Sequence, residues 1–72
     1  MKRNKLIKLR KEKKKTQACI ANEVGIDRGY YSNIENGKKM GSLDTWLKIA
    51  KVLEIPPVEL LSYIIEGMEI SA

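Results

Sequence analysis

The sequence of 72 residues contains no histidine, no phenylalanine, one cysteine and two prolines. The missing histidine removes the most frequent metal ligand and the most frequent general base. Cys19 has no second cysteine with which to form an intrachain disulfide and no imidazole to activate its thiol. We therefore expect no enzymatic activity, no metal and no cofactor, and interpret Cys19 as a semi-buried thiol in a reducing cytoplasm.

Long hydrophobic runs are missing as well. No stretch of about 18 apolar residues exists, and the charged N-terminal end is not followed by the apolar core of a secretory signal. The sequence therefore predicts a cytoplasmic protein with no membrane partner. Its length suits one small domain, residues 1–72, and the modest core of so short a chain favours a partner subunit.

Positive charge is concentrated at one end of the chain. Residues 1–15 carry nine basic side chains and one acidic one, whereas residues 16–72 carry five basic and eight acidic ones. A basic surface attracts polyanions and gains affinity by releasing their counterions. The alternatives are a solvated run without function and a membrane-surface helix, for which Leu6, Ile7 and Leu9 offer too small an apolar face.

Apolar periodicity predicts five helices and an all-α fold. The expected ranges are residues 4–14, 16–24, 27–37, 42–53 and 56–67. Side chains that accept hydrogen bonds from helix amides begin four of them, and prolines begin the fifth. Gly25 should end the second helix in the left-handed conformation. The four capping residues are Asn4, Thr16, Asp27 and Ser42.

The third predicted helix has a packing side with Tyr31 and Ile34 and a polar side that suits base edges. Arg28 can donate to guanine, and Asn33 can pair with adenine. Gly29 costs about 1 kcal/mol of helix propensity. It either lets the backbone approach a base or sugar, or merely loosens the helix start, and both readings stay open.

Phosphate groups are the expected ligands around this helix. The free amides at the start of the second helix, beside Thr16 and Gln17, favour an anion. Lys38 and Lys39 add charge where the chain leaves the third helix, although two exposed lysines in a turn are common.

Taken together, these residues resemble the helix-turn-helix domains of the phage repressor and Cro type, the Xre family. The resemblance covers about residues 6–61 and implies a compact, lambda-repressor-like five-helix domain whose third helix enters the major groove. The motifs that carry it are Leu9-Arg10, Thr16-Gln17, Ile20-Ala21, Gly25-Ile26, Tyr31-Ser32, Ile34-Glu35-Asn36-Gly37, Ser42-Leu43 and Leu47-Lys48-Ile49-Ala50.

The resemblance also implies roles for single residues. It pairs Arg10 with Glu35 as a structural ion pair. The implied base-proximal residues are Gln17, Arg28, Gly29, Ser32 and Asn33. The implied phosphate contacts are Thr16, Tyr30, Asn36, Lys38 and Lys39.

Two departures from the family pattern alter these expectations. Lys15 replaces the usual apolar residue before the Thr-Gln pair, so we add it to the expected phosphate contacts. Met40-Gly41 replaces an Asn-Pro-like pair, which predicts a more mobile loop after the third helix.

The C-terminal extension, residues 62–72, is rich in apolar side chains, and such a patch typically marks an interface. We expect a homodimer, with residues 68–71 as an extended tail that pairs across it; packing onto the chain's own core is the alternative. The expected dimer contacts are Leu61, Ile64, Ile65 and Met68, with Tyr63 and Ile70 as further apolar residues.

The sequence thus predicts a transcriptional regulator that binds double-stranded DNA, most simply a dimeric repressor of a palindromic operator. No small-molecule ligand is evident. The alternatives are an antitoxin-type interaction module with secondary DNA binding and a restriction-modification controller.

Overall fold

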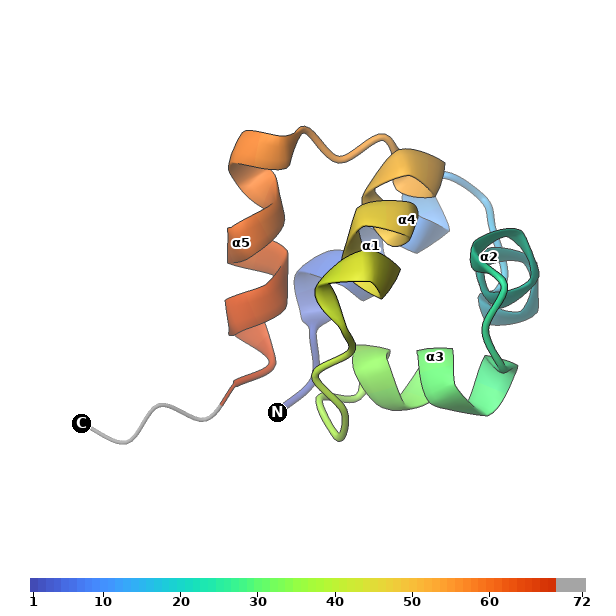
Figure 1. Ribbon diagram of the computed structural model, residues 1–72, viewed down its shortest axis with the longest axis horizontal. Coiled ribbons are helices and arrows are strands. Elements are labelled where there is room, and N and C mark those ends of the chain that lie inside the picture. Colours follow the sequence, from blue (N-terminus) through green and yellow to red (C-terminus); the bar gives the residue numbers. More distant parts are fainter. Residues whose placement is uncertain (69–72) are drawn as a thin grey trace.

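Five helices enclose one core in the computed structural model, which describes residues 1–68 (Figure 1). No strand occurs among these residues, so the all-α prediction is confirmed. Within the same residues, no helix is long and apolar enough to cross a membrane. The helices are α1 (Asn4–Glu12), α2 (Gln17–Val24), α3 (Arg28–Glu35), α4 (Leu43–Leu53) and α5 (Pro57–Glu66).

Local capping chemistry begins three helices as predicted. The hydroxyl of Thr16 accepts from the Cys19 amide at 3.1 Å, and the hydroxyl of Ser42 accepts from the Thr45 amide at 3.1 Å. Asp27 accepts from the first amides of α3. Each cap satisfies a donor that has no partner within its own helix. Gly25 ends α2 in the left-handed conformation with φ of 84°, also as predicted.

The predicted end of the first helix and its predicted cap were wrong, although its first residue agrees with the prediction. The helix stops at Glu12 rather than at residue 14, because Lys14 takes a left-handed φ of 57° that turns the chain towards α2. Asn4 lies inside the helix and does not cap it; the capping position belongs to Arg3, which forms no side-chain cap bond. A carboxylate oxygen of Glu66 in α5 instead accepts from the Lys5 amide at 2.7 Å.

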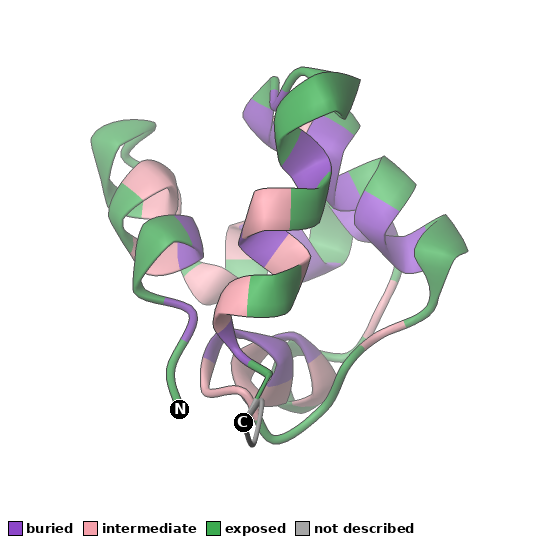
Figure 2. Ribbon diagram, turned by 90° about the vertical axis from the view of Figure 1, so that its left-hand side faces the viewer, coloured by how far each residue is buried: buried purple, intermediate pink, exposed green. Residues whose placement is uncertain are grey.

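The core is built from one or more side chains of every helix and is visible as the buried inner faces in Figure 2. Leu47 of α4 is 53% exposed, although its neighbour Trp46 is buried. Trp46 and Ile49 fill the α4 side of the core and leave Leu47 outside it. The apolar side chains with at most 1% exposure are Leu6, Ile20, Tyr31, Ile34, Trp46, Ile49 and Leu53.

The cap supplied from α5 predicts an unusual ranking of two substitutions. Glu66→Ala should lower the free energy of unfolding by about 1 kcal/mol, because it leaves a helix-start amide unpaired. Asn4→Ala should change it by less than about 0.5 kcal/mol, because alanine favours a helix interior. Urea unfolding of both variants makes the comparison, and a larger loss for Asn4→Ala would contradict the assignment.

Candidate nucleic-acid interface

Helix α3 lies along one side of the molecule, with its outer face uncovered (Figure 1). Tyr31 and Ile34, both fully buried, anchor its inner face. Arg28 and Gly29 are exposed at its start, and Ser32 and Asn33 are half-buried along it. The structure therefore leaves a polar strip of short side chains open on the outer side of α3.

Gly29 lies in this strip beside the cap of α3. Its amide donates to Oδ2 of Asp27 at 2.8 Å, and an added Cβ would lie 2.8 Å from the same atom. Because that oxygen is the acceptor that caps α3, a larger residue at position 29 would have to displace it. Both readings of Gly29 therefore stay open.

The buried carboxylate of Glu35 joins three helices. Its Oε2 accepts from Nε of Arg10 in α1 at 2.6 Å, and its Oε1 accepts from Nε2 of Gln17 in α2 at 2.9 Å. The side chain of Glu35 is 1% exposed and that of Arg10 is 12% exposed. The hydrogen bond with Glu35 raises the pKa of Arg10 although burial opposes this, so Arg10 stays charged.

Gln17 therefore uses part of its hydrogen-bonding capacity within the protein. One of its amide N–H groups is held by Glu35, which leaves the carbonyl oxygen and the second N–H for a ligand. Such a side chain offers an acceptor to a base amino group and one remaining donor to a phosphate. Its fixed amide also gives α2 a side chain of defined orientation next to α3.

The Tyr31 hydroxyl lies beside this network without joining it. It is buried and has no hydrogen-bond partner in residues 1–68. Burial, and after it the negative charge of Glu35, raises the pKa of Tyr31 far above its ordinary value. The phenol therefore stays protonated and neutral beside the ion pair.

Hydrogen bonds to α3, α4 and Arg3 hold the loop of residues 37–41, which follows α3. The amides of Lys38 and Lys39 both donate to the carbonyl of Asn33, at 2.9 and 3.2 Å. Trp46 Nε1 donates to the Met40 carbonyl at 2.7 Å, and Arg3 donates to the Lys39 carbonyl at 2.9 Å. Both lysine residues are exposed, so the loop presents two cations from a backbone held at four points.

The other expected phosphate contacts lie near the helix ends. Lys15 is half-buried, and its Nζ is 3.2 Å from a carboxylate oxygen of Glu23. Thr16 is exposed at the start of α2, and its hydroxyl is used by the helix cap. Tyr30 is half-buried, as is Asn36, whose amide is 3.5 Å from the Ser32 hydroxyl. Each of these residues is at least partly exposed to solvent. Lys15, the one cation among them, is paired with Glu23.

The basic run of residues 1–15 is divided between surface and interior. Arg3 is 1% exposed, and Arg10 is bound to Glu35. Nζ of Lys13 lies 3.4 Å from a carboxylate oxygen of Glu54. Glu54 belongs to the α4–α5 connection, which lies on the side opposite α3 (Figure 1). The run is therefore not one continuous surface for DNA. The burial of Arg3 was not predicted, although its spacing of three residues from Leu6 and seven from Arg10 places it on the same side as these two inward-facing side chains.

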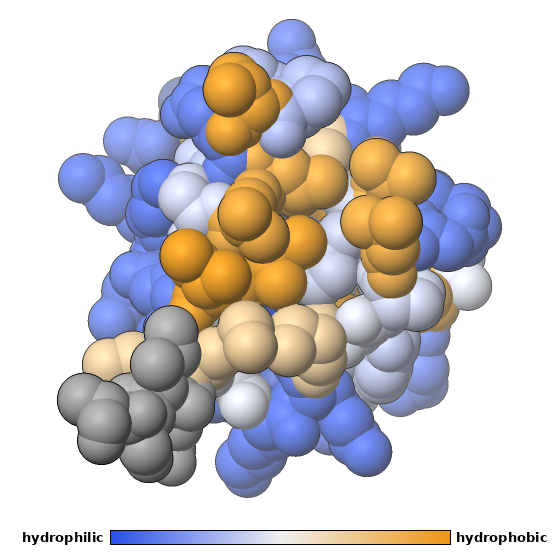
Figure 3. All heavy atoms as spheres, turned by 60° about the vertical axis from the view of Figure 1, so that its left-hand side comes forward, coloured by the Kyte–Doolittle hydropathy of each residue, from blue (hydrophilic) through white to orange (hydrophobic). Residues whose placement is uncertain are grey.

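Apolar side chains gather on the face formed by α5, as Figure 3 shows. Leu61 is 64% exposed, Ile65 43% and Met68 37%, and Ile64 is half-buried. Tyr63 instead packs into the core with 9% exposure. Ile70 and most of the tail expected over residues 68–71 lie outside the described residues.

Comparison with known proteins identifies the fold and its class. Residues 4–64 match the sequence model of the family described as a helix-turn-helix domain. The chain belongs to the helix-turn-helix family. It is 50% identical over 60 residues to the control protein C.MunI of a Mycoplasma species, a match that covers 82% of this chain and 81% of that protein.

A second relative is the transcriptional repressor RstR of the cryptic phage CTXphi from Vibrio cholerae serotype O1. The two are 38% identical over 58 residues, which cover 81% of this chain and 52% of the repressor. The chain thus matches about half of that repressor's length. No solved structure gives a significant match.

The hydrogen bonds around Glu35 predict that loss of the Arg10 side chain affects the stability of the fold before it affects DNA specificity. Arg10→Ala should lower the free energy of unfolding by about 3 kcal/mol, because it leaves a buried carboxylate without its cation. Thermal melting followed by circular dichroism measures this. Lys8→Ala, which removes an exposed cation from the same helix, is the control and should melt like the wild type. An unchanged melting curve for Arg10→Ala would refute the structural role.

Proposed function

We propose that this helix-turn-helix protein is a cytoplasmic dimeric repressor that reads a palindromic operator by inserting α3 into the major groove. The observation that carries the proposal is the open polar strip of α3. Arg28, Gly29, Ser32 and Asn33 lie on it, while fully buried Tyr31 and Ile34 hold the helix from behind. A rigid helix with short polar side chains on its free face is suited to contact base edges.

The broader class rests on the comparisons. Membership in the helix-turn-helix family, together with relatives named a control protein and a transcriptional repressor, makes the chain a DNA-binding transcriptional regulator. Its action requires binding alone: a protein seated on a promoter excludes polymerase.

In the proposed complex, affinity and sequence choice come from different groups. Phosphate contacts fix register and orientation, and base contacts specify sequence. Lys38 and Lys39 supply cations beside the end of α3, and the amides at the start of α2 supply donors near Thr16. Arg28 and Asn33 read bases, with Gln17 at the neighbouring helix start.

The homodimer is supported by the apolar face of α5. Leu61 and Ile65 are large apolar side chains that remain 64% and 43% exposed. A two-fold interface through this face would pair two α3 helices on half-sites about 34 Å apart, one turn of DNA. Palindromic operators follow from that symmetry.

Of the two alternative functions, restriction-modification controller and antitoxin-type interaction module, a specific observation favours the controller. A relative of 50% identity over most of both chains bears the name control protein. Flanking methyltransferase or nuclease genes would favour the controller, whereas a toxin-like neighbour would favour the antitoxin-type module.

Selection of bound sequences from random DNA tests whether the polar strip of α3 contacts bases. The wild type should enrich a palindrome whose affinity falls steeply with salt, as phosphate contacts require. Asn33→Ala should cost about 1 to 3 kcal/mol on that site and relax the choice at one base pair of each half-site. Asn22→Ala, the same change at an exposed position of α2, should retain the wild-type motif. An equal loss by Asn33→Ala on all sequences would count against base reading.

Sedimentation of a charged variant tests the dimer. Leu61→Glu should convert the dimer to a monomer, because it places a carboxylate in an apolar interface. Operator affinity should fall at least tenfold with the half-site preference unchanged. Lys51→Ala, which alters net charge by the same amount at an exposed site on α4, should remain dimeric. A Leu61→Glu protein that sediments like the wild type would rule out this interface.

A further inference from the structure

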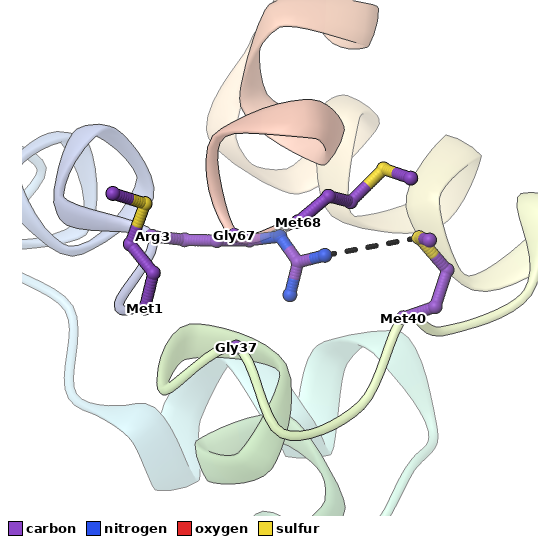
Figure 4. A pocket seen from close by; sticks show the side chains of 6 residues that line it. All are labelled: Met1, Arg3, Gly37, Met40, Gly67 and Met68. Carbon is purple, nitrogen blue, oxygen red and sulfur yellow. Dashed lines mark hydrogen bonds between the residues drawn. The ribbon is translucent and has the colours of Figure 1, made fainter. Parts of the chain in front are cut away.

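Arg3 occupies the junction of the N-terminal segment, the end of α3 and the end of α5. A pocket of about 380 Å³ opens there, lined by Met1, Arg3, Gly37, Met40, Gly67 and Met68. Figure 4 shows the Arg3 side chain extending past Gly67 with its guanidinium directed towards Met40. The side chain is 1% exposed, which is unusual for an arginine.

The guanidinium connects three segments that are distant in sequence. Nη1 donates to the carbonyl of Ile34 in the last turn of α3 at 2.6 Å and to that of Lys39 in the loop at 2.9 Å. Nε donates to the carbonyl of Ile64 in α5 at 3.1 Å. The same side chain therefore fixes the loop that carries Lys38 and Lys39 relative to α3 and α5.

Carbonyl groups balance much of the charge of Arg3. Within residues 1–68 no carboxylate lies within 4 Å of the guanidinium, and the charge faces the C-terminal ends of two helices, where a cation is favourable. Its central carbon also lies 5.3 Å from the centroid of the Trp46 ring. Burial lowers the pKa of Arg3 and the charge of Glu66 opposes this; arginine remains charged regardless.

Two glycines make room for this arrangement. A Cβ on Gly67 would lie 2.7 Å from both Cγ and Cζ of Arg3. A Cβ on Gly37, which has φ of 76°, would overlap the Met1 carbonyl oxygen. The absence of a side chain at Gly37, after α3, and at Gly67, after α5, thus leaves room for the N-terminal segment.

We propose that Arg3 is a positioning residue for DNA binding, which holds the loop of Lys38 and Lys39 in place against the operator phosphates. The proposal rests on the proposed function for its DNA. Arg3 itself is buried and does not touch the nucleic acid. A lysine cannot replace it, because one ammonium group lacks the planar set of donors that reaches three separated carbonyls.

A double-mutant cycle on the selected operator tests this role. Arg3→Met should weaken binding about tenfold. It should also reduce the slope of log affinity against log salt by about 1 to 2 per subunit, at about 0.9 per lost phosphate contact. The double variant Lys38→Ala with Lys39→Ala should show a similar loss, and adding Arg3→Met to it should change little further. Lys11→Met, which removes an exposed cation from α1, is the charge-matched control. An unchanged slope, or losses that add in full, would overturn the proposal.

Two further variants separate positioning from general stability. Arg3→Lys keeps the charge, and Gly67→Ala keeps the arginine but displaces its guanidinium. Both should reduce the salt slope at a temperature where circular dichroism shows a wild-type helix content. Full rescue of the slope by lysine would overturn the proposal, and so would a wild-type slope for Gly67→Ala. These variants also serve if Arg3→Met does not fold.

Amide hydrogen exchange tests the same role without DNA. The amides of Lys38 and Lys39 bond to Asn33, and Arg3→Lys or Gly67→Ala should speed their exchange at least tenfold more than that of the α2 amides. An equal change in both regions would indicate general destabilisation and refute positioning. If selection finds no preferred DNA, the proposed function fails, while this exchange result still decides whether Arg3 holds the loop.

Discussion

The buried carboxylate of Glu35 is the constraint on which the helix-turn-helix geometry depends. An ionised carboxylate in the interior is costly unless donors surround it. Here the donors are Arg10 from α1 and Gln17 from α2, so satisfying one charge fixes two helices against the end of α3. The backbone carbonyl of the same residue accepts from the Arg3 amide at 2.7 Å. The first three helices and the N-terminal segment therefore meet at one residue.

Features decided by neighbouring residues could be predicted from the sequence. The caps at Thr16, Asp27 and Ser42, the left-handed Gly25 and the five helices all follow from contacts within a few positions. Features decided by distant residues could not. The α1 start is capped by Glu66, 61 positions from Lys5, and no local pattern reveals that bond.

The charge pattern shows a different limit of sequence reasoning. Composition treats the nine cations of residues 1–15 alike, but the fold separates them by chemistry. Arginine can be buried because its planar group donates in several directions, as Arg3 does to three carbonyls and Arg10 does to a carboxylate. Lysine concentrates its charge at one point and stays near water. Two arginines of the basic run thus hold parts of the fold together from inside, and the exposed cations that follow the end of α3 are Lys38 and Lys39.

Two buried charged side chains, Glu35 and Arg3, hold the C-terminal end of α3. Glu35 binds donors from α1 and α2, and Arg3 binds the carbonyl of Ile34 one residue earlier. With Asp27 capping the opposite end, α3 is held at both ends in the free protein. If α3 enters DNA as proposed, a helix ordered in advance loses little conformational entropy on binding, which leaves more of the contact energy for affinity. Because Nε of Arg3 also donates to the carbonyl of Ile64, the same side chain links the end of α3 to α5, the helix that carries the proposed dimer face.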